Sequence, residues 1–380
     1  MSLRNLRVDQ VGSLLRPRDL IEAFVSRGCD QIDDDALQSL QDKAIEAVVS
    51  KQEALGLPIV SDGEYRRLNW QVSFSRVAGW DLWQRSWDLF LKNPGQDASV
   101  GEKAGERGTD AVEVFKVPAT MDLSLIENFP LREFNFLRSI TETPSKIMIM
   151  GPDRVAQMCD VSNSHGPYRS REVFLDHVAE IQNQMVGELI QAGCTYIQID
   201  EPSYTGYVDA HSLGRIKEMG EDPEENLRRA VRATNSVISS YQGLACFGVH
   251  ICRGNRASMW HREGSYDRIA EYLFSELMFD RLLLEYDTER AGSFDALRFV
   301  PKNGPVVVLG LITTKTDKVE SVDDLLFRVE EAQKFIDIGQ LAISPQCGFA
   351  SGIGGNLLSE YSQWQKLEVM LEAAEKIWGA

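Results

Sequence analysis

Positive charge is scarce in this 380-residue sequence. Its 40 lysines and arginines stand against 57 aspartates and glutamates, which gives a formal net charge of -17. A surface with this excess of carboxylates does not attract phosphate, so the sequence argues against nucleic acid as a partner. The same excess disfavours binding to an anionic membrane. Solubility is the simple explanation that is left for the acidity.

Long hydrophobic runs and paired cysteines are also lacking. No run approaches the roughly 20 apolar residues of a membrane span, and Met1–Gln10 has no apolar core of the signal-peptide kind. The six cysteines are scattered and include no CxxC pair, which argues against a disulfide framework and against a structural zinc knot. We therefore expect a cytoplasmic protein whose cysteines are free to act as ligands.

What the sequence does contain is an alternation of short apolar runs and longer amphipathic segments, which predicts a parallel sheet with crossover helices. Eight predicted strands are enough to close a (β/α)8 TIM barrel, so we expect an α/β protein with one catalytic domain over residues 1–380. The predicted strands are Arg7–Ser13, Pro58–Asp62, Lys146–Gly151, Tyr196–Asp200, Ala245–His250, Leu282–Tyr286, Val306–Leu311 and Leu341–Ser344. The predicted helices include Asp34–Leu55, Arg171–Ala192, Pro223–Tyr241, Tyr266–Met278, Val322–Ile336 and Tyr361–Ile377.

One connection is too long for a barrel turn. About 80 residues separate Tyr65 from Lys146, whereas connections in such folds are usually a few residues long. We expect an insertion after strand 2, at about residues 70–145. It either caps the active site or forms a contact between subunits of a homo-oligomer.

Potential metal ligands follow the predicted strands at the end where barrel enzymes carry their catalytic residues. His250 and Cys252 are two residues apart on an extended strand, so their side chains point to the same side. Glu285 and Cys347 stand at two further strand ends. Imidazole, thiolate and carboxylate are zinc ligands. Ligands dispersed in this way favour a catalytic zinc, although an H-x-C pair alone is more often buried core filler.

Two cysteine ligands point to thiol chemistry. A free thiol with a pKa near 8.5 is mostly protonated at neutral pH, and a bound zinc deprotonates it. A zinc hydrolase would more commonly use histidine and carboxylate ligands to activate water.

Carboxylates at neighbouring strand ends suggest the kind of thiol. Asp200 and Glu64 could bind an ammonium group, and Gly12 with Ser13 would offer close-approaching backbone and a hydroxyl. Together they suit an amino acid with a thiol side chain. The alternative is that the two carboxylates cap helices or pair with nearby arginines.

Two cations at strand ends each have two readings. Lys315 could protonate a leaving nitrogen or bind an anionic donor, or it could be a solvated loop lysine. Arg253 could meet a substrate carboxylate, or it could pair with an aspartate or glutamate.

These residues as a set resemble the catalytic barrel of cobalamin-independent methionine synthase, in particular its short, methionine-synthase-like branch. The matching segments are Val11-Gly12-Ser13, Gly63-Glu64, Ile199-Asp200-Glu201-Pro202, His250-Ile251-Cys252, Glu285 and Pro345-Gln346-Cys347-Gly348. The resemblance implies methyl transfer from a 5-methyltetrahydrofolate to homocysteine, forming methionine. It also implies that His250, Cys252, Glu285 and Cys347 bind zinc. Asp200, Glu64 and the backbone around Gly12 and Ser13 would then hold homocysteine.

The chain departs from the long enzymes of this family in three ways. It matches the catalytic barrel without their large N-terminal half, it has Lys315 where they have a histidine proposed as proton donor, and it has Met158 where they have a tryptophan that stacks on the pterin. The resemblance therefore implies thiol activation, while another small methyl donor stays open.

Other functions remain as alternatives. The same zinc thiolate could open an epoxide with coenzyme M, but that thiol carries a sulfonate and no ammonium for Asp200 and Glu64 to bind. A zinc hydrolase is disfavoured by the two cysteines and by the absence of an H-E-x-x-H motif. A non-catalytic barrel with structural zinc is the last alternative.

Overall fold

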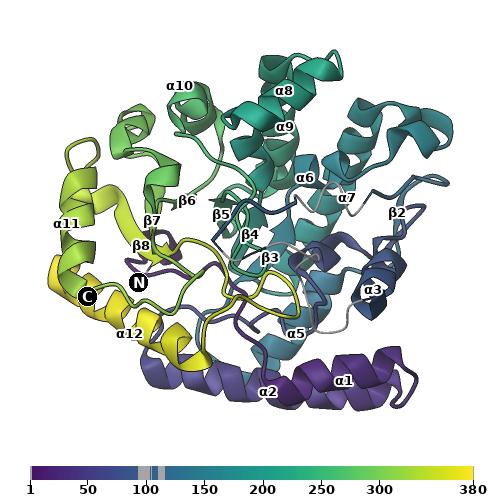
Figure 1. Ribbon diagram of the computed structural model, residues 1–380, viewed down its shortest axis with the longest axis horizontal. Coiled ribbons are helices and arrows are strands. Elements are labelled where there is room, and N and C mark those ends of the chain that lie inside the picture. The colour runs from purple at the N-terminus through teal and green to yellow at the C-terminus, as the bar shows by residue number, and fades with distance from the viewer. Residues whose placement is uncertain (1, 93–102, 104, 110–115, 380) are drawn as a thin grey trace.

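The centre of the molecule is a parallel sheet of six strands in the order β3-β4-β5-β6-β7-β8 (Figure 1). The computed structural model describes residues 2–92, 103, 105–109 and 116–379. The six strands are Ile147–Met150 (β3), Tyr196–Asp200 (β4), Cys246–Ile251 (β5), Arg281–Glu285 (β6), Val306–Ile312 (β7) and Leu341–Pro345 (β8). Every residue in them is buried, as expected for strands covered on both faces. Six of the predicted strands are thus confirmed to within one residue at each end.

Two extended segments, one near Val8 and one near Val60, complete the ring of strands that the sequence predicted. Val8 pairs with Ile343 of β8, and Val60 pairs with Ser145 just before β3, each through an isolated parallel bridge. The Leu14 amide donates to the Gly63 carbonyl at 3.1 Å, which joins the first two segments to each other. The predicted strands Arg7–Ser13 and Pro58–Asp62 are therefore extended segments with single bridges, not full ladders.

Glutamine side chains explain why these ladders are short. The Gln52 amide donates to the Ser61 carbonyl and accepts from the Ser61 amide, at 2.8 and 3.0 Å. The Gln10 amide donates to the Ile59 carbonyl at 3.1 Å. Side chains thus satisfy backbone groups that a neighbouring strand would otherwise pair.

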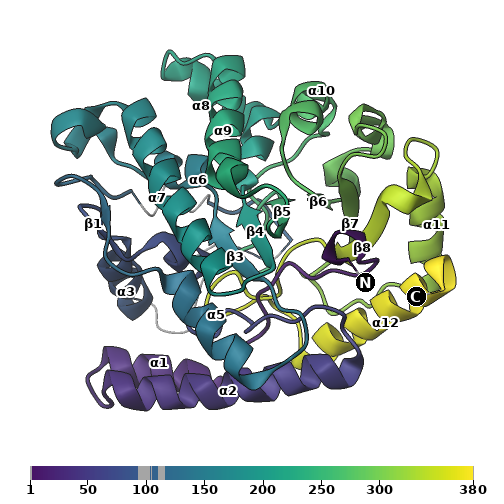
Figure 2. The same ribbon diagram turned by 180° about the vertical axis from the view of Figure 1, so that it is seen from behind.

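Helices surround the sheet (Figure 2). The helix predicted at Asp34–Leu55 is α2; it begins where the Asp33 carboxylate accepts from the Ala36 amide and ends at Gly56, whose φ is 86°. All five other predicted helices are also confirmed, with ends that differ by up to four residues. The helices are Arg18–Gly28 (α1), Asp34–Leu55 (α2), Leu82–Lys92 (α3), Phe129–Ile140 (α5), Pro152–Gln157 (α6), Arg171–Gln191 (α7), Ala210–Glu218 (α8), Pro223–Ile238 (α9), Asp267–Glu276 (α10), Val322–Ala332 (α11) and Glu360–Trp378 (α12). Among the described helices, none combines the length and apolar character that crossing a membrane requires.

The long connection before β3 contains several elements. They are a 3-10 turn (Trp70–Phe74), α3, α5 and a two-stranded antiparallel sheet of β1 (Val77–Ala78) and β2 (Ser124–Leu125). Helix α5 packs against β3 and α7. Residues 105–109 pack against the loop that follows β5. The Gly108 amide donates to the carbonyl of Trp260 in that loop at 2.8 Å. Part of this connection therefore covers the loop after the predicted metal ligands.

Candidate metal centre

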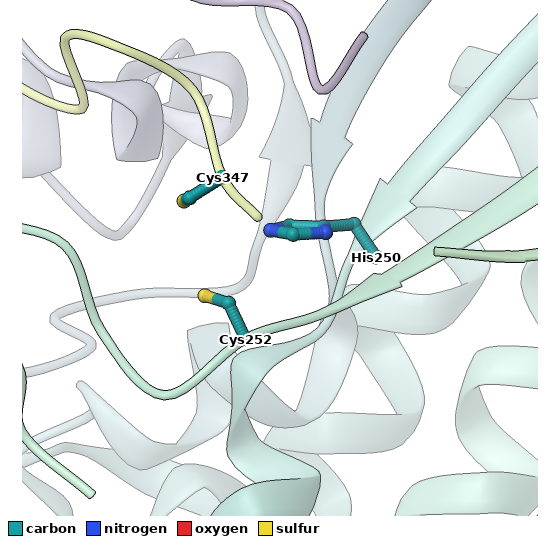
Figure 3. Close-up of side chains that lie close together, drawn as sticks. All are labelled: His250, Cys252 and Cys347. Carbon is teal, nitrogen blue, oxygen red and sulfur yellow. The ribbon is translucent and has the colours of Figure 1, made fainter. Parts of the chain in front are cut away.

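Three predicted ligands from two strand ends meet in one buried cluster (Figure 3). His250 and Cys252 extend from the end of β5, and Cys347 follows β8. One ligand atom of each lies within 4.8 Å of the other two. Both ring nitrogens of His250 are buried and have no hydrogen-bond partner among the described residues. Because an unpaired buried polar group costs free energy, these nitrogens suit coordination to a metal ion.

The donor set fits zinc. In a tetrahedral zinc site with bonds of about 2.0–2.3 Å, neighbouring ligand atoms lie roughly 3.3–3.8 Å apart. The three side chains already approach this spacing from a rigid sheet. Two thiolates and one imidazole with an open fourth position are a known catalytic ligand set. These three residues would hold the ion and leave its fourth ligand position to another group.

The two thiols share a proton unequally. A hydrogen bond from Cys347, together with the neighbouring His250, lowers the pKa of Cys252 well below its ordinary value. The same hydrogen bond, together with burial, raises the pKa of Cys347. Cys252 is therefore the thiol of the pair that loses its proton more readily.

The fourth predicted ligand, Glu285, is not part of this close group. Its carboxylate accepts from Arg290 Nη2 and from the Arg253 amide, both at 2.5 Å. Burial alone would raise its pKa, but the charges of Lys315, Arg290 and Arg253 hold it below the ordinary value. Glu285 is thus an ionised carboxylate at the edge of the cluster. Its two oxygens already accept hydrogen bonds from an arginine and from a backbone amide.

The two predicted ammonium ligands lie near the cluster. Asp200 ends β4, in register with His250 on β5. Burial raises its pKa to about 6, opposed by His250 and by a hydrogen bond from Gln198. Burial also raises the pKa of Glu64 to about 7, with Asp200 contributing and Arg67 opposing. Glu64 Oε1 pairs with Arg67 Nη1 at 3.1 Å, while its Oε2 is buried without a hydrogen-bond partner in the described part of the chain. Part of the arginine-pairing alternative is therefore correct for Glu64, yet one oxygen remains available to a ligand.

Gly12 and Ser13 lie beside the third metal ligand. The Phe349 amide donates to the Ser13 carbonyl at 2.8 Å. A Cβ atom on Gly348 would lie 1.9 Å from Ser13 Oγ, and one on Gly12 would lie 2.3 Å from Met148 Cε. The predicted acceptor-binding backbone therefore packs against the loop that carries Cys347, and Gly12, whose φ is 144°, has a conformation that favours glycine.

For Arg253 the sequence left two partners open, a substrate carboxylate or an acidic side chain, and in the structure its guanidinium contacts backbone carbonyls and a tyrosine. Its side chain is fully buried and stacks on Tyr266 at 4.2 Å from the ring centroid. The guanidinium donates to the carbonyls of Gly264, Glu285 and Ala291 and to the Tyr266 hydroxyl. Its donors are consumed by the protein, so Arg253 shapes the loop after Cys252 instead.

Lys315 faces the opposite situation. Its side chain is 6% exposed, and its Nζ has no hydrogen-bond partner among the residues that the structure describes. The charge of Lys315 acts to lower the pKa of Glu285 and of Cys347. Lys315 is therefore a buried cation next to the cluster and not a solvated loop residue.

A set of side chains to which the sequence assigned no role joins the loops of the site. Asn255 Nδ2 donates to the Gly348 carbonyl at 2.6 Å. Asn356 Nδ2 donates to Asn255 Oδ1 at 2.9 Å and to the Thr314 carbonyl at 2.8 Å. We call Asn255, Thr314 and Asn356 the loop clamp, because they connect the loops after β5, β7 and β8. Their only signal in the sequence is their position next to predicted site residues.

Comparisons with known proteins agree with this architecture. Residues 112–376 match the family model for the catalytic domain of cobalamin-independent synthase. The chain is 31% identical to the uncharacterized protein YxjH of Bacillus subtilis over 98% of this chain and 94% of that one. It is 24% identical to the methionine synthase of Pyrococcus abyssi over 98% of this chain and 93% of the relative.

A solved structure extends the likeness to three dimensions. A Listeria monocytogenes protein described as a vitamin-B12-independent methionine synthase superposes with a TM-score of 0.75 at 26% identity, covering 99% of this chain and 98% of that one. The fold class predicted from the sequence, a TIM barrel, is thereby confirmed. The chain belongs to the cobalamin-independent methionine synthase family and is a methyltransferase of that type.

Proposed function

We propose that this protein is a zinc-dependent S-methyltransferase that transfers a methyl group from a 5-methyltetrahydrofolate, or another small donor, to homocysteine. The observation that supports this best is the convergence of the His250, Cys252 and Cys347 ligand atoms within 4.8 Å beside two buried carboxylates. A metal–thiolate site next to an ammonium site matches an amino acid that carries a thiol.

Each residue has a role in this proposal. His250, Cys252 and Cys347 would hold zinc, with Glu285 as a further candidate ligand if it gives up its contact with Arg290. Bound zinc supplies a Lewis acid that keeps a substrate thiol deprotonated at neutral pH. Asp200 and Glu64 bind the acceptor's ammonium group, and the backbone at Gly12 and Ser13 positions its carboxylate. The ammonium of Lys315 binds the donor or delivers a proton to its leaving nitrogen.

The same carboxylates argue against the coenzyme M alternative. Its sulfonate would face Asp200 and Glu64, and burial of like charges without partners is unfavourable. A hydrolase would use the open position for water, yet the neighbouring acceptor site suits a small amino acid.

Metal content tests the ligand assignment. We expect about one zinc per chain after purification, and we expect Cys347→Ser to lose most of it, because a hydroxyl is a much weaker zinc ligand than a thiolate. Cys194→Ser is the matched control, since Cys194 is also buried but lies outside the cluster. Plasma emission spectrometry measures both. Full zinc content in Cys347→Ser would refute the site.

A donor screen tests the reaction. The zinc-loaded protein is mixed with homocysteine and with methyltetrahydrofolate mono- or polyglutamates, methylcobalamin or S-methylmethionine, and methionine is quantified by mass spectrometry. We expect methionine only when both homocysteine and a competent donor are present. Donor consumption that is independent of homocysteine would reject homocysteine as the acceptor.

A further inference from the structure

A continuous chain of buried polar side chains runs through the inside of the barrel towards Asp200. On β4, Gln198 and Asp200 are two residues apart and point to the same side. Lys146 Nζ donates to Gln198 Oε1 at 2.7 Å, and Gln198 Nε2 donates to Asp200 Oδ1 at 2.7 Å and to the Val11 carbonyl at 2.9 Å. Lys146 and Gln198 are fully buried, so water does not compete for these bonds.

The orientation of the Gln198 amide is fixed by its partners. An ammonium can only donate hydrogen bonds, and a carbonyl can only accept them. The amide oxygen must therefore face Lys146, and the amide nitrogen must face Val11 and Asp200. The reverse orientation would place the amide nitrogen against the Lys146 ammonium, which is also a donor. It would place the amide oxygen against the Val11 carbonyl and the Asp200 carboxylate, which are also acceptors.

The consequence for Asp200 is a defined direction. Within the described part of the chain, Gln198 is the one hydrogen-bond donor to this carboxylate, and it contacts Oδ1 alone. A carboxylate held by one oxygen presents the other to a ligand. Since Asp200 is in register with His250 of the candidate metal cluster, its other oxygen would serve the acceptor of the proposed function.

We propose that Gln198, locked by Lys146, is a positioning residue that aims Asp200 at the ammonium group of an α-amino thiol and so makes the enzyme select thiols that carry one. This inference rests on the proposed function. It goes further by naming what distinguishes homocysteine from a thiol acid of the same length without the amino group, 4-sulfanylbutanoate.

Equilibrium binding of these two thiols tests the proposal without knowledge of the methyl donor. Both are titrated calorimetrically into zinc-loaded wild type, Gln198→Met and Gln198→Glu. Methionine has a similar length but no donor, and glutamate keeps an acceptor for Lys146. We expect either change to weaken homocysteine binding about tenfold, the effect of losing a hydrogen bond to a charged group, while 4-sulfanylbutanoate binds as before.

The matched control is Gln182→Leu. Gln182 is equally buried and donates to the Met150 carbonyl at 2.7 Å, but it lies on α7, outside the barrel interior. We expect this variant to bind both thiols as the wild type does. Zinc content and melting temperature are measured for every variant.

The outcomes distinguish a failure of the Gln198 positioning role from a failure of the proposed function. If the wild type prefers homocysteine and the Gln198 variants keep that preference, or weaken both thiols equally, the positioning role is wrong while the proposed function stands. If the wild type binds neither thiol, the acceptor assignment itself fails.

Discussion

Glu64 combines three features that are unusual for a buried glutamate. Its backbone is in the left-handed region, with φ of 60°, which costs a non-glycine residue roughly 1–2 kcal/mol. The surroundings enforce this conformation, because the Glu64 amide donates to Asp62 at 2.9 Å and its carbonyl accepts from Arg16 at 2.7 Å. One carboxylate oxygen has no partner among the described residues. A strained, incompletely paired carboxylate is typical of a residue kept for binding.

The raised pKa of Glu64 makes a prediction about stability. The pKa rises from 4.5 to about 7 in the folded protein, so the folded state holds a proton that the unfolded state releases above pH 4.5. The wild type should therefore lose stability as pH rises from 4.5 to 7, by about 3 kcal/mol at 1.36 kcal/mol per pKa unit. Glu64→Gln cannot ionise, so its free energy of unfolding should rise relative to wild type over this window and level off above it.

Urea denaturation at several pH values measures this difference. The comparison with wild type cancels the titration of all other groups. Glu22→Gln serves as the control, since Glu22 is 63% exposed and forms only a surface pair with Arg18. A difference between Glu64→Gln and wild type that does not change with pH would contradict the raised pKa.

At the scale of elements, the loop clamp ties the ends of three strands together. Asn255 belongs to the loop that carries Cys252, Thr314 precedes Lys315, and Asn356 belongs to the loop that starts at Cys347. Asn356 Oδ1 also accepts from the Ser258 amide at 3.0 Å. In the proposed metal site, ligands that come from separate strands need support from residues behind them, and the clamp is placed to give that support.

Removing the clamp should weaken metal binding more than it weakens the fold. Asn356→Ala loses hydrogen bonds to two loops, and we expect zinc affinity to fall about tenfold or more, the range reported for supporting residues. Competition with a chromophoric chelator measures this. Asn163→Ala is the control, because Asn163 bonds only to Asp160 in a surface turn. Equal zinc affinity in the two variants would show that the clamp does not set the ligand spacing.

The elements were predictable to different degrees. Apolar runs specify buried strands, so β3 to β8 could be located from the sequence, and the strand-end rule then placed His250, Cys252 and Cys347 correctly. The first two strands were overestimated, because glutamine side chains take over their backbone pairing. The hydrogen-bond partners of Arg253 and Gln198 could not be predicted, since a buried donor chooses among partners that only the closed barrel brings together.

At the scale of the whole molecule, a buried charge network joins distant parts of the barrel at the N-terminal ends of its strands. Asp9 accepts from Lys146 Nζ at 2.8 Å, from Arg281 Nε at 3.0 Å and from the Tyr196 hydroxyl at 2.7 Å. Lys146, Arg281 and Asp9 have side chains that are 0% exposed. Charged residues are rarely buried completely unless they are paired. The network therefore connects the extended segment Arg7–Ser13 to β3, β4 and β6.

Breaking this network should destabilise the entire fold. Asp9→Ala leaves two buried cations without their shared anion, and removal of one partner from a buried pair typically costs about 3–5 kcal/mol. Glu22→Ala removes an exposed pair and should cost less than about 1 kcal/mol. Chemical denaturation of the two variants provides the measurement. Similar losses for both would mean that water or another group compensates the charges around Asp9.

The single bridges at Val8 and Val60 divide the ring into two unequal sectors. Gly12, Ser13 and Glu64 belong to the sparsely paired sector, where a local opening breaks few backbone hydrogen bonds. His250, Cys252 and Cys347 extend from β5 and β8 of the continuous sheet. Local opening of the barrel is therefore expected on the side where the acceptor of the proposed function would enter, and not on the side that would hold the ion.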